Sequence, residues 1–436
     1  MLSCCVALTA HAAGDPFQTQ ATVASGVTGY LDRDCGVSTQ AMTLVAVVDA
    51  ALCNNPQTRA AWANARAAAA QLGSAQSAYL PTLNGSASIS RDRNALTGNA
   101  ATNQNLGLSL NYLLFDFGAR SAQTDAARAT LEAANRNQDQ SVNAVYLAVV
   151  QAYYQYFAAQ AQLEALHEAE KSAQLSLNAA DARFQAGTNT KADVLQAQTA
   201  YSQARLSSLR GEGGVRIAQG VLSNAMGMVA DQVVSLAPPT DQVLSKNLPD
   251  NVRELILQAQ QQRPDLQAAA AQLRVAQAQV RAAAAAGKPT VALTASSNYQ
   301  DNGSLNGAGS SVGVAVAMPL FSGFNTTYKV RAAEAQVAAS QAQRAQVANQ
   351  VALDVWRAWQ TLATEAAALA ATDDLINSAA ASAQLALGRY RAGVGNILDV
   401  LSAQASLASA RSQQVQAQYN WRIAKVTLAQ AVGRLE

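Results

Sequence analysis

One phrase of the sequence occurs twice, and this repeat constrains the fold more than any other feature. The segments ARFQAGTNTKADVLQAQ, at residues 182–198, and GRYRAGVGNILDVLSAQ, at residues 388–404, share Arg-aromatic, Ala-Gly, Asp-Val-Leu and Ala-Gln at the same spacing. The same shift of 206 positions also superposes Leu114-Phe115 on Leu320-Phe321. Self-similarity at a fixed distance indicates that one structural unit is built twice.

The repeat divides the chain into two similar parts. We place the first structural repeat at residues 41–230, the second at residues 251–436 and a linker between them at residues 231–250. The linker is rich in proline, and proline discourages helix because it has no backbone N–H to donate.

Each repeat opens with a pattern typical of helix, predicted over residues 45–79 and 252–287. Pro81 and Pro289 end these helices, because the residue before a proline is pushed out of the helical region. Two segments follow in which apolar residues alternate with small or polar ones, which is typical of strands. The predicted strands lie at about residues 82–91, 105–115, 290–299 and 311–321.

The predicted strands have one apolar face, and two explanations are open. In the first, the strands form a small sheet whose apolar face packs on the protein's own helices. In the second, they cross a membrane, for which about 9–11 residues with one apolar face suffice. Open sheet edges are not stable in lipid, and a barrel needs at least about eight strands. Four strands per chain would then require several copies, and three copies would supply twelve strands.

Two long helical patterns follow the strand pairs, over residues 118–186 and 323–392, and neither contains proline. At a rise of 1.5 Å per residue each helix would reach roughly 100 Å. Turns are predicted at about residues 187–191 and 393–397, each followed by a return helix. We expect the first return helix to be interrupted by the GEGG segment at residues 211–214.

The predicted order of helix, strand pair and long helical hairpin occurs twice in the chain. This arrangement resembles that of the TolC family of trimeric outer-membrane channels. The resemblance is carried by the repeated segments at residues 182–198 and 388–404, and by YLPTLNGSASIS, LLFDFGARSAQTDAA and PLFSGFNTTYKVRAAEAQ. It implies a mainly α fold with a small β part, in which the duplicated helix–β-hairpin–long helical hairpin unit forms a trimer. In such a trimer a 12-stranded outer-membrane β-barrel is continued by a periplasmic α-helical tunnel.

The resemblance also implies a function, a location and partners. Members of this family are passive exit ducts of efflux or type I secretion systems, located in the cell outer membrane with a large periplasmic helical portion. They contact outer-membrane lipid and are coupled through a periplasmic adaptor (membrane fusion) protein to an inner-membrane pump, ABC or proton-driven. The alternative is a periplasmic coiled-coil adaptor or scaffold protein, which usually carries only one helical hairpin.

Composition and motifs argue against catalysis and nucleic-acid binding. The 436 residues carry a net formal charge of +2, so the chain lacks the basic excess that attracts nucleic acid. His11 and His167 are its two histidines, and it contains no HExxH, GxxxxGK[ST] or G-x-S-x-G motif. We therefore expect no enzyme activity, no cofactor and no metal, and the energy for transport must come from partners.

The N-terminal residues resemble an export signal. Residues 1–13 are predicted to be a signal peptide remnant, because the Ala-His-Ala at residues 10–12 fits a cleavage site, and residues 14–40 an N-terminal extended segment. In an exported chain Cys35 and Cys53 are expected to form a disulfide; two separate thiols and a weak metal site are the alternatives. This pair, and the absence of a convincing acylation site, make the chain look more like the type I secretion members.

The repeated segment has a structural explanation at each turn. Gly187 and Gly393 stand where a helix end needs a residue in the left-handed conformation. Each turn then offers an N-cap and, three residues later, an acid whose carboxylate can bond back to the cap. These pairs are Thr190 with Asp193 and Asn396 with Asp399.

By resemblance, the two turns form the periplasmic end of the tunnel. The predicted gate residues are Tyr390, Gly393, Asp399 and Ser402, and the predicted adaptor-facing residues are Arg183, Gly187, Lys191 and Asp193. A ring of Asp399 from three chains would attract cations to a narrow aperture. The family commonly has a second acid and a basic residue where this chain has Ser402 and Gly395, so the ionic latch is reduced here. Tyr390 can still hydrogen-bond across helices.

Overall fold

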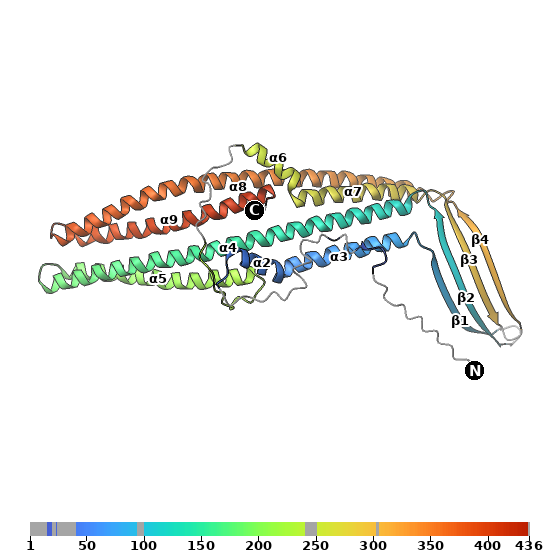
Figure 1. Ribbon diagram of the computed structural model, residues 1–436, viewed down its shortest axis with the longest axis horizontal. Helices are drawn as coiled ribbons and strands as arrows, with labels where there is room; N and C mark the ends of the chain where they lie inside the picture. The colour runs from blue at the N-terminus through green and yellow to red at the C-terminus, as the bar shows by residue number, and fades with distance from the viewer. Residues whose placement is uncertain are drawn as a thin grey trace. The chain divides into compact units, whose positions relative to one another are not determined.

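The computed structural model describes residues 15–19, 23, 41–93, 100–239, 251–301 and 305–434 (Figure 1). The fold is mainly helical, with one four-stranded antiparallel sheet. Both repeats have the same order of elements: two short helices, a β-hairpin, a very long helix and a return helix. By its contacts the chain divides into two compact units that cut across this repeat. One unit contains Trp62–Asn137 and Asp265–Val347, and the other contains Gln138–Pro264 and Ala348–Glu436.

The opening helix of each repeat is broken by a proline. The four resulting helices are α2 (Leu44–Asn54), α3 (Pro56–Ser77), α6 (Val252–Gln262) and α7 (Pro264–Ala285). Asn55 and Arg263, the residues at the breaks, have extended backbones with ψ of 126° and 127°. A proline excludes its predecessor from the helical region but is itself favoured at the first position of a helix. The prediction of one helix over residues 45–79, and of another over 252–287, is therefore wrong.

The two β-hairpins form a single sheet. Its strands are β1 (Thr82–Arg93), β2 (Ala100–Phe115), β3 (Thr290–Asp301) and β4 (Asn306–Ala317). They lie in the order β1-β2-β3-β4, and every neighbouring pair is antiparallel. β4 begins and ends earlier than the predicted 311–321, because the glycine-rich residues before position 311 also pair with β3, with Asn306 opposite Asp301.

The apolar face of this sheet is not covered by the protein's own described helices. β1 and β4 are exposed along their whole lengths. On their apolar face Leu83, Val312 and Val314 keep 63%, 78% and 63% of their surface exposed. Of the two explanations for the strand pattern, packing of this face on the chain's own helices is thus excluded for the described residues.

The long helices have the predicted extent. They are α4 (Ala119–Gln185) and α8 (Asn325–Arg391), each of 67 residues, followed by the return helices α5 (Lys191–Ala225) and α9 (Ile397–Val432). The predicted interruption at residues 211–214 is wrong, since α5 runs through it. A Cβ at Gly211 would lie 2.9 Å from the Leu166 side chain, so this glycine allows α5 to approach α4 closely. No helix among the described residues has the length and apolar character needed to span a membrane.

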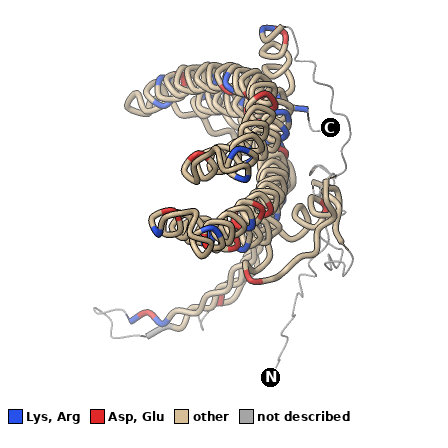
Figure 2. Tube along the Cα trace, turned by 90° about the vertical axis from the view of Figure 1, so that its left-hand side faces the viewer, with Lys and Arg blue, Asp and Glu red and all other residues tan. Residues whose placement is uncertain are grey.

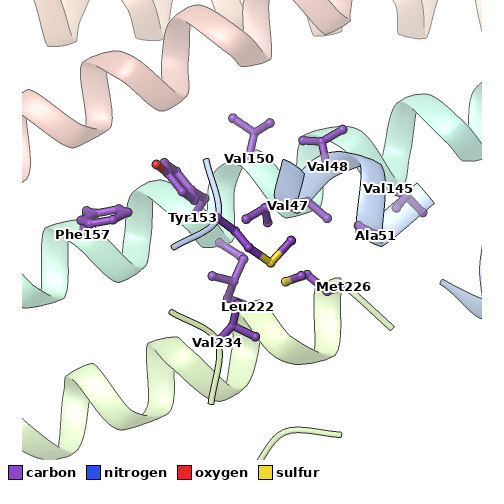
Figure 3. Close-up of a cluster of buried hydrophobic side chains, with 13 residues drawn as sticks. Val47, Val48, Ala51, Val145, Val150, Tyr153, Phe157, Leu222, Met226 and Val234 are labelled. Carbon is purple, nitrogen blue, oxygen red and sulfur yellow. The ribbon is translucent and has the colours of Figure 1, made fainter. Parts of the chain in front are cut away.

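A cluster of buried apolar side chains joins α2, the middle of α4 and the end of α5 (Figure 3). Its members include Val47, Val48, Ala51, Val145, Val149, Val150, Tyr153, Phe157, Leu222 and Met226. The contacting side chains are larger than the alanines that line most of the helical length, which explains why the core is concentrated here.

The described part of the predicted linker, residues 231–239, contacts this cluster. Met42 donates its N–H to the Ser235 carbonyl and accepts from the N–H of Ala237, both at 2.9 Å. The hydroxyl of Tyr153 donates to the Ala237 carbonyl at 2.8 Å. These bonds fix the start of the linker against α4. Residues 240–250 lie outside the described chain.

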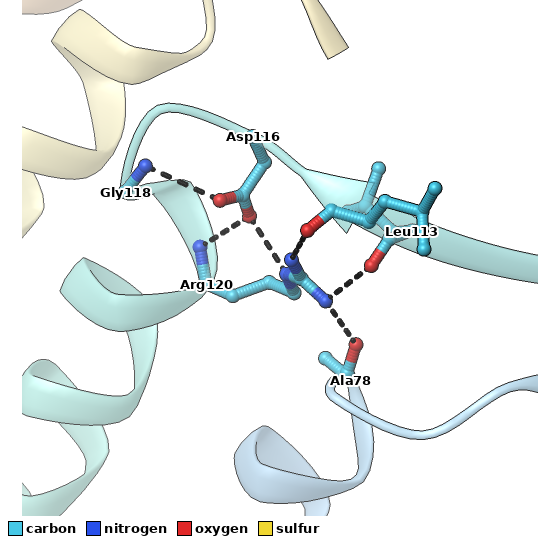
Figure 4. A network of polar contacts seen from close by, with 6 residues as sticks. Ala78, Leu113, Asp116, Gly118 and Arg120 are labelled. Atoms are coloured by element: carbon cyan, nitrogen blue, oxygen red, sulfur yellow. Dashed lines mark hydrogen bonds and ion pairs between the residues drawn. The ribbon is translucent and has the colours of Figure 1, made fainter. Parts of the chain in front are cut away.

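A buried ion pair fixes the joint between β2 and α4 (Figure 4). The Asp116 carboxylate accepts from the Arg120 side chain at 3.0 Å and from its backbone N–H at 2.8 Å. The guanidinium also donates to the carbonyl oxygens of Ala78, Leu113 and Leu114. Burial raises the pKa of the Asp116 carboxyl, but the bonds from Arg120 and Gly118 outweigh it, so this pKa lies below its ordinary value. In the second repeat Ser322 and Thr326 stand at these positions, so that joint has no such pair.

Candidate functional site at the helical tips

The first helical tip, residues 183–193, ends α4 and begins α5. Gly187 has a φ of 71°, the left-handed conformation that lets the chain leave the helix. The N–H groups of Gly187 and Thr188 donate to the carbonyls of Phe184 and Arg183 at 3.0 and 2.9 Å. Thr190 and Asp193 then form a reciprocal capping box at the start of α5. The predicted cap and acid are therefore confirmed at this tip.

The second helical tip, residues 389–399, has the same turn with a different cap. Gly393 has a φ of 80°, and its N–H donates to the Tyr390 carbonyl at 3.0 Å. Gly395 has no room for a side chain, because a Cβ would lie 2.8 Å from the backbone nitrogen of Tyr390. Asn396 caps α9 by accepting from the N–H of Leu398 at 2.9 Å. In the described tip no bond joins Asp399 back to this cap, so the second half of the predicted capping box is absent.

The two tips contact each other through Tyr390. Its hydroxyl accepts a hydrogen bond from the Asn189 side chain at 2.8 Å. The Arg183 guanidinium lies over the Tyr390 ring, 4.3 Å from its centre, and donates to the Arg391 carbonyl at 3.1 Å. Tyr390 is 4% exposed and packs on Ile397. One buried tyrosine thus links the two helical hairpins of the chain at their ends.

The charges at the tips are mostly solvated. Figure 2 shows acidic and basic residues at both tips, which lie nearest the viewer. Asp399 is exposed, and Lys191 is exposed with its ammonium 5.3 Å from the centre of the Phe184 ring. Among the described residues no salt bridge joins the tips, and the polar link between them consists of two hydrogen bonds and one cation–π contact.

The structure brings together some of the predicted site residues and separates others. Arg183, assigned to the adaptor-facing set, contacts Tyr390, assigned to the gate set. The two glycines lie in the turns, Lys191 and Asp193 lie in the first turn of α5, and Ser402 is exposed on α9. The two sets therefore share one contact and are not independent surfaces.

Sequence analysis missed Asn189, the residue that binds the Tyr390 hydroxyl. The shift of 206 positions places Asn189 opposite Gly395, so the comparison of the two repeats shows a mismatch there rather than a pattern. A second missed link lies along the helices, where the Ser176 hydroxyl donates to Gln404 at 3.1 Å. Both bonds join segments far apart in the sequence, and no local spacing indicates them.

The predicted disulfide is only partly within the described chain. Cys53 is buried at the end of α2 and is disulfide-bonded. Cys35 lies outside the described residues. Its pairing with Cys53 stays a prediction.

The chemistry of the described chain is that of packing and hydrogen bonding. His167 is half exposed on α4 and lies 4.0 Å from a Glu212 oxygen across to α5. In the part of the chain that the structure describes, no group of three or more His, Cys, Asp or Glu residues is placed to hold a metal ion.

Both repeats of the chain match known proteins. A family model described as outer membrane efflux protein matches residues 47–228 and 255–434. Protein CyaE of Bordetella pertussis is 32% identical over 405 residues, which cover 90% of this chain and 84% of that protein. Outer membrane efflux protein BepC of Brucella suis is 30% identical over 404 residues, covering 90% of this chain and 86% of that protein.

A solved structure agrees with the fold. The structure of CusC superposes with a TM-score of 0.82 at 22% identity, and the match covers 90% of this chain and 92% of that chain. Likeness at this identity shows the fold, and the sequence matches carry the family. The alternative of an adaptor or scaffold has no support in these matches. The resemblance to the TolC family is confirmed, and the chain belongs to the outer membrane efflux protein family.

Proposed function

We propose that three copies of the chain form one passive exit duct, with a 12-stranded outer-membrane β-barrel continued by a periplasmic helical tunnel. Membership of the family makes the chain an outer-membrane channel for efflux or secretion. The proposal concerns how copies build that channel, how its periplasmic end closes and which partners drive it.

The uncovered two-faced sheet carries the proposal. Its apolar face is exposed, and its other face carries hydroxyl, amide and glycine residues such as Asn84, Ser109 and Ser296. β1 and β4 are the outer strands, and each has one edge without a partner among the described strands. Open edges are not stable in lipid, and four strands are too few to close a barrel. Pairing β4 of one copy with β1 of the next removes the edges and places the polar face inside.

The helical tips are proposed as the gate and the docking site for the adaptor. Tyr390 and Asn189 hold the two hairpins of one copy together, and separating the hairpins would break this bond. Exposed Asp399 residues from three copies would surround the aperture. Lys191 and Asp193, in the first tip, would face the adaptor.

The energy for transport is proposed to come from partners. A periplasmic adaptor would connect the tips to an inner-membrane pump, ABC or proton-driven. Of the two kinds of system, the cysteine pair favours type I secretion. Co-purification of the adaptor and pump with the tagged full chain would identify the system.

The assembly is tested with the purified full chain in detergent and in planar bilayers. Native mass spectrometry is expected to give a trimer, and the bilayer is expected to conduct ions. A monomer that does not conduct would overturn the proposed duct.

A matched pair of variants tests which face of the sheet meets lipid. Val312→Arg places a charge on the apolar face, where arginine costs about 2–4 kcal/mol near the bilayer centre. Gly313→Arg places it on the opposite face, at the next residue of β4, where a Cβ has open space. Val312→Arg should lower the yield of membrane-inserted trimer and Gly313→Arg should not. Equal yields from the two variants would contradict the assignment of the faces.

A further inference from the structure

Two arginines at the far end of β1 stand on the apolar face of the sheet. Alternate residues of a strand lie on opposite faces, so Arg91 and Arg93 share the face of Leu83 and Ile89, while Asp92 lies on the other. Arg91 and Arg93 are exposed, and neither takes part in a salt bridge within the described chain. Two guanidinium groups thus follow directly after an exposed apolar band.

The apolar band ends at the level of Ile89. Along the same face, one level of the sheet contains Leu83 with Leu110 and Val312. The next contains Gly85 with Leu108, Ser297 and Ser310, and the one after it contains Ala87 with Leu106 and Tyr299. The level of Ile89 continues across the sheet as Gln104, Asp301 and Asn306. Arg91 lies one level beyond, about 7 Å further along the strand. The arginines therefore stand just outside the band that would meet lipid tails.

The acids at this end of the sheet are engaged elsewhere. The Asp92 carboxylate accepts from the Asn103 side chain and from the Ser90 hydroxyl on the polar face. Asp301 lies two strands away, about 10 Å from β1, and has an interaction of its own. The hairpin loops at residues 94–99 and 302–304 contain no charged residue. Figure 2 shows charged residues of both signs beside the loop of the first hairpin.

We propose that Arg91 and Arg93 bind the phosphate groups of an anionic lipid headgroup in the outer leaflet of the outer membrane. A guanidinium binds phosphate through parallel N–H donors, and the neighbouring apolar side chains select a phosphate that is attached to a lipid. Three copies would place six such arginines around the barrel. The proposal rests on the exit duct proposed above, because only membrane insertion brings this face to a headgroup.

The test compares lipid binding by three forms of the full-length protein in phosphatidylcholine nanodiscs. They are the wild type, Arg91→Gln/Arg93→Gln, and a control Arg205→Gln/Arg210→Gln that removes two exposed charges from α5. The probe is diphosphoryl lipid A, and the same lipid without phosphates serves as the second ligand. At about 1 kcal/mol for each arginine near an anionic surface, the first variant should bind the diphosphoryl lipid about 30-fold more weakly. The control should bind like the wild type.

The remaining measurements distinguish a lipid phosphate from free phosphate. They also distinguish failure of the arginine site from failure of the exit duct. The dephosphorylated lipid should bind all three forms equally, and inorganic phosphate should not compete with the lipid. Competition by free phosphate, or equal affinity of the wild type and Arg91→Gln/Arg93→Gln for the diphosphoryl lipid, would overturn the site. If the proteins still insert and conduct, the exit duct stands without it. A wild type that neither inserts nor conducts overturns the duct.

Discussion

At the scale of single residues, Tyr390 shows how one side chain can connect the two halves of a duplicated chain. Its hydroxyl accepts from Asn189 and its ring supports Arg183, so both contacts reach from the second tip to the first. The equivalent residue in the first repeat is Phe184, which has no hydroxyl to return the bond. The two tips are thus chemically different although their turns are alike.

Tyr390→Phe is expected to loosen the tips without removing the ring below Arg183. A hydrogen bond of this kind is worth about 1 kcal/mol net, roughly fivefold in an equilibrium between closed and open tips. If this bond holds the gate closed, the variant should conduct more in planar bilayers. Tyr156→Phe is the matched control, since among the described residues the Tyr156 hydroxyl bonds only Gln160, within α4. Conductance indistinguishable from that control would leave Tyr390 without a gating role.

At the scale of elements, patterns that depend on local chemistry were predictable and those that depend on distant contacts were not. The absence of proline predicts both 67-residue helices, and Gly187 and Gly393 predict the turns. The breaks before Pro56 and Pro264 were missed because a proline also fits the first turn of a helix. The glycines at residues 211–214 were misassigned because the close approach of α4, which explains Gly211, is a tertiary contact.

In the candidate site, too, contacts between residues close in sequence were predictable and contacts between distant segments were not. The capping box of Thr190 and Asp193 follows from the spacing along the chain, and the structure contains it. The bond from Asn189 to Tyr390 joins two tips whose meeting depends on the packing of whole helices. No pattern in the sequence encodes that meeting, so the partner of Tyr390 could not be named in advance.

Tyr153 provides a prediction for the packing of α4 against the linker segment. Burial raises the pKa of Tyr153 to about 12 from its ordinary 10, with smaller contributions from neighbouring tyrosines. The folded state therefore holds the phenol proton more tightly than the unfolded chain does. The stabilisation is complete below pH 10 and is lost as the pH rises through about 12.

The melting temperature, followed by circular dichroism, should therefore fall more steeply between pH 10 and pH 12 for the wild type than for Tyr153→Phe. At neutral pH the variant should be less stable by about 1–3 kcal/mol, because the Ala237 carbonyl loses its donor. Tyr201→Phe, on α5, controls for the loss of one phenol. Parallel pH profiles for the wild type and Tyr153→Phe would show that folding does not raise the pKa of this tyrosine.

At the scale of the whole molecule, the proposed trimer repeats each strand edge and each helical tip of one chain three times around a common axis. The unpaired edges of β1 and β4 become seams between copies, and the two tips of each chain become six around the mouth. The helical hairpins are duplicated within the chain, but the residues at their tips differ. The first tip has its acid, Asp193, bound in a capping box, whereas Asp399 is exposed and makes no bond to its cap. In the proposed trimer, Asp399 of the second tip would therefore be the carboxylate that faces the aperture.

Asp399→Asn tests this ring by removing three negative charges from the assembled mouth. Each carboxylate attracts a cation 6 Å away by about 0.7 kcal/mol in water, so three together contribute about 2 kcal/mol before screening. The ratio of cation to anion permeability, obtained from reversal potentials, should fall severalfold in 0.1 M salt. The difference should shrink at 1 M, where the screening length is about 3 Å. Asp193→Asn is the control, because it removes the same charge from the first tip and disrupts a capping box. An equal change in both variants would assign the effect to the stability of the tips, and no change in Asp399→Asn would place its carboxylate away from the ion path.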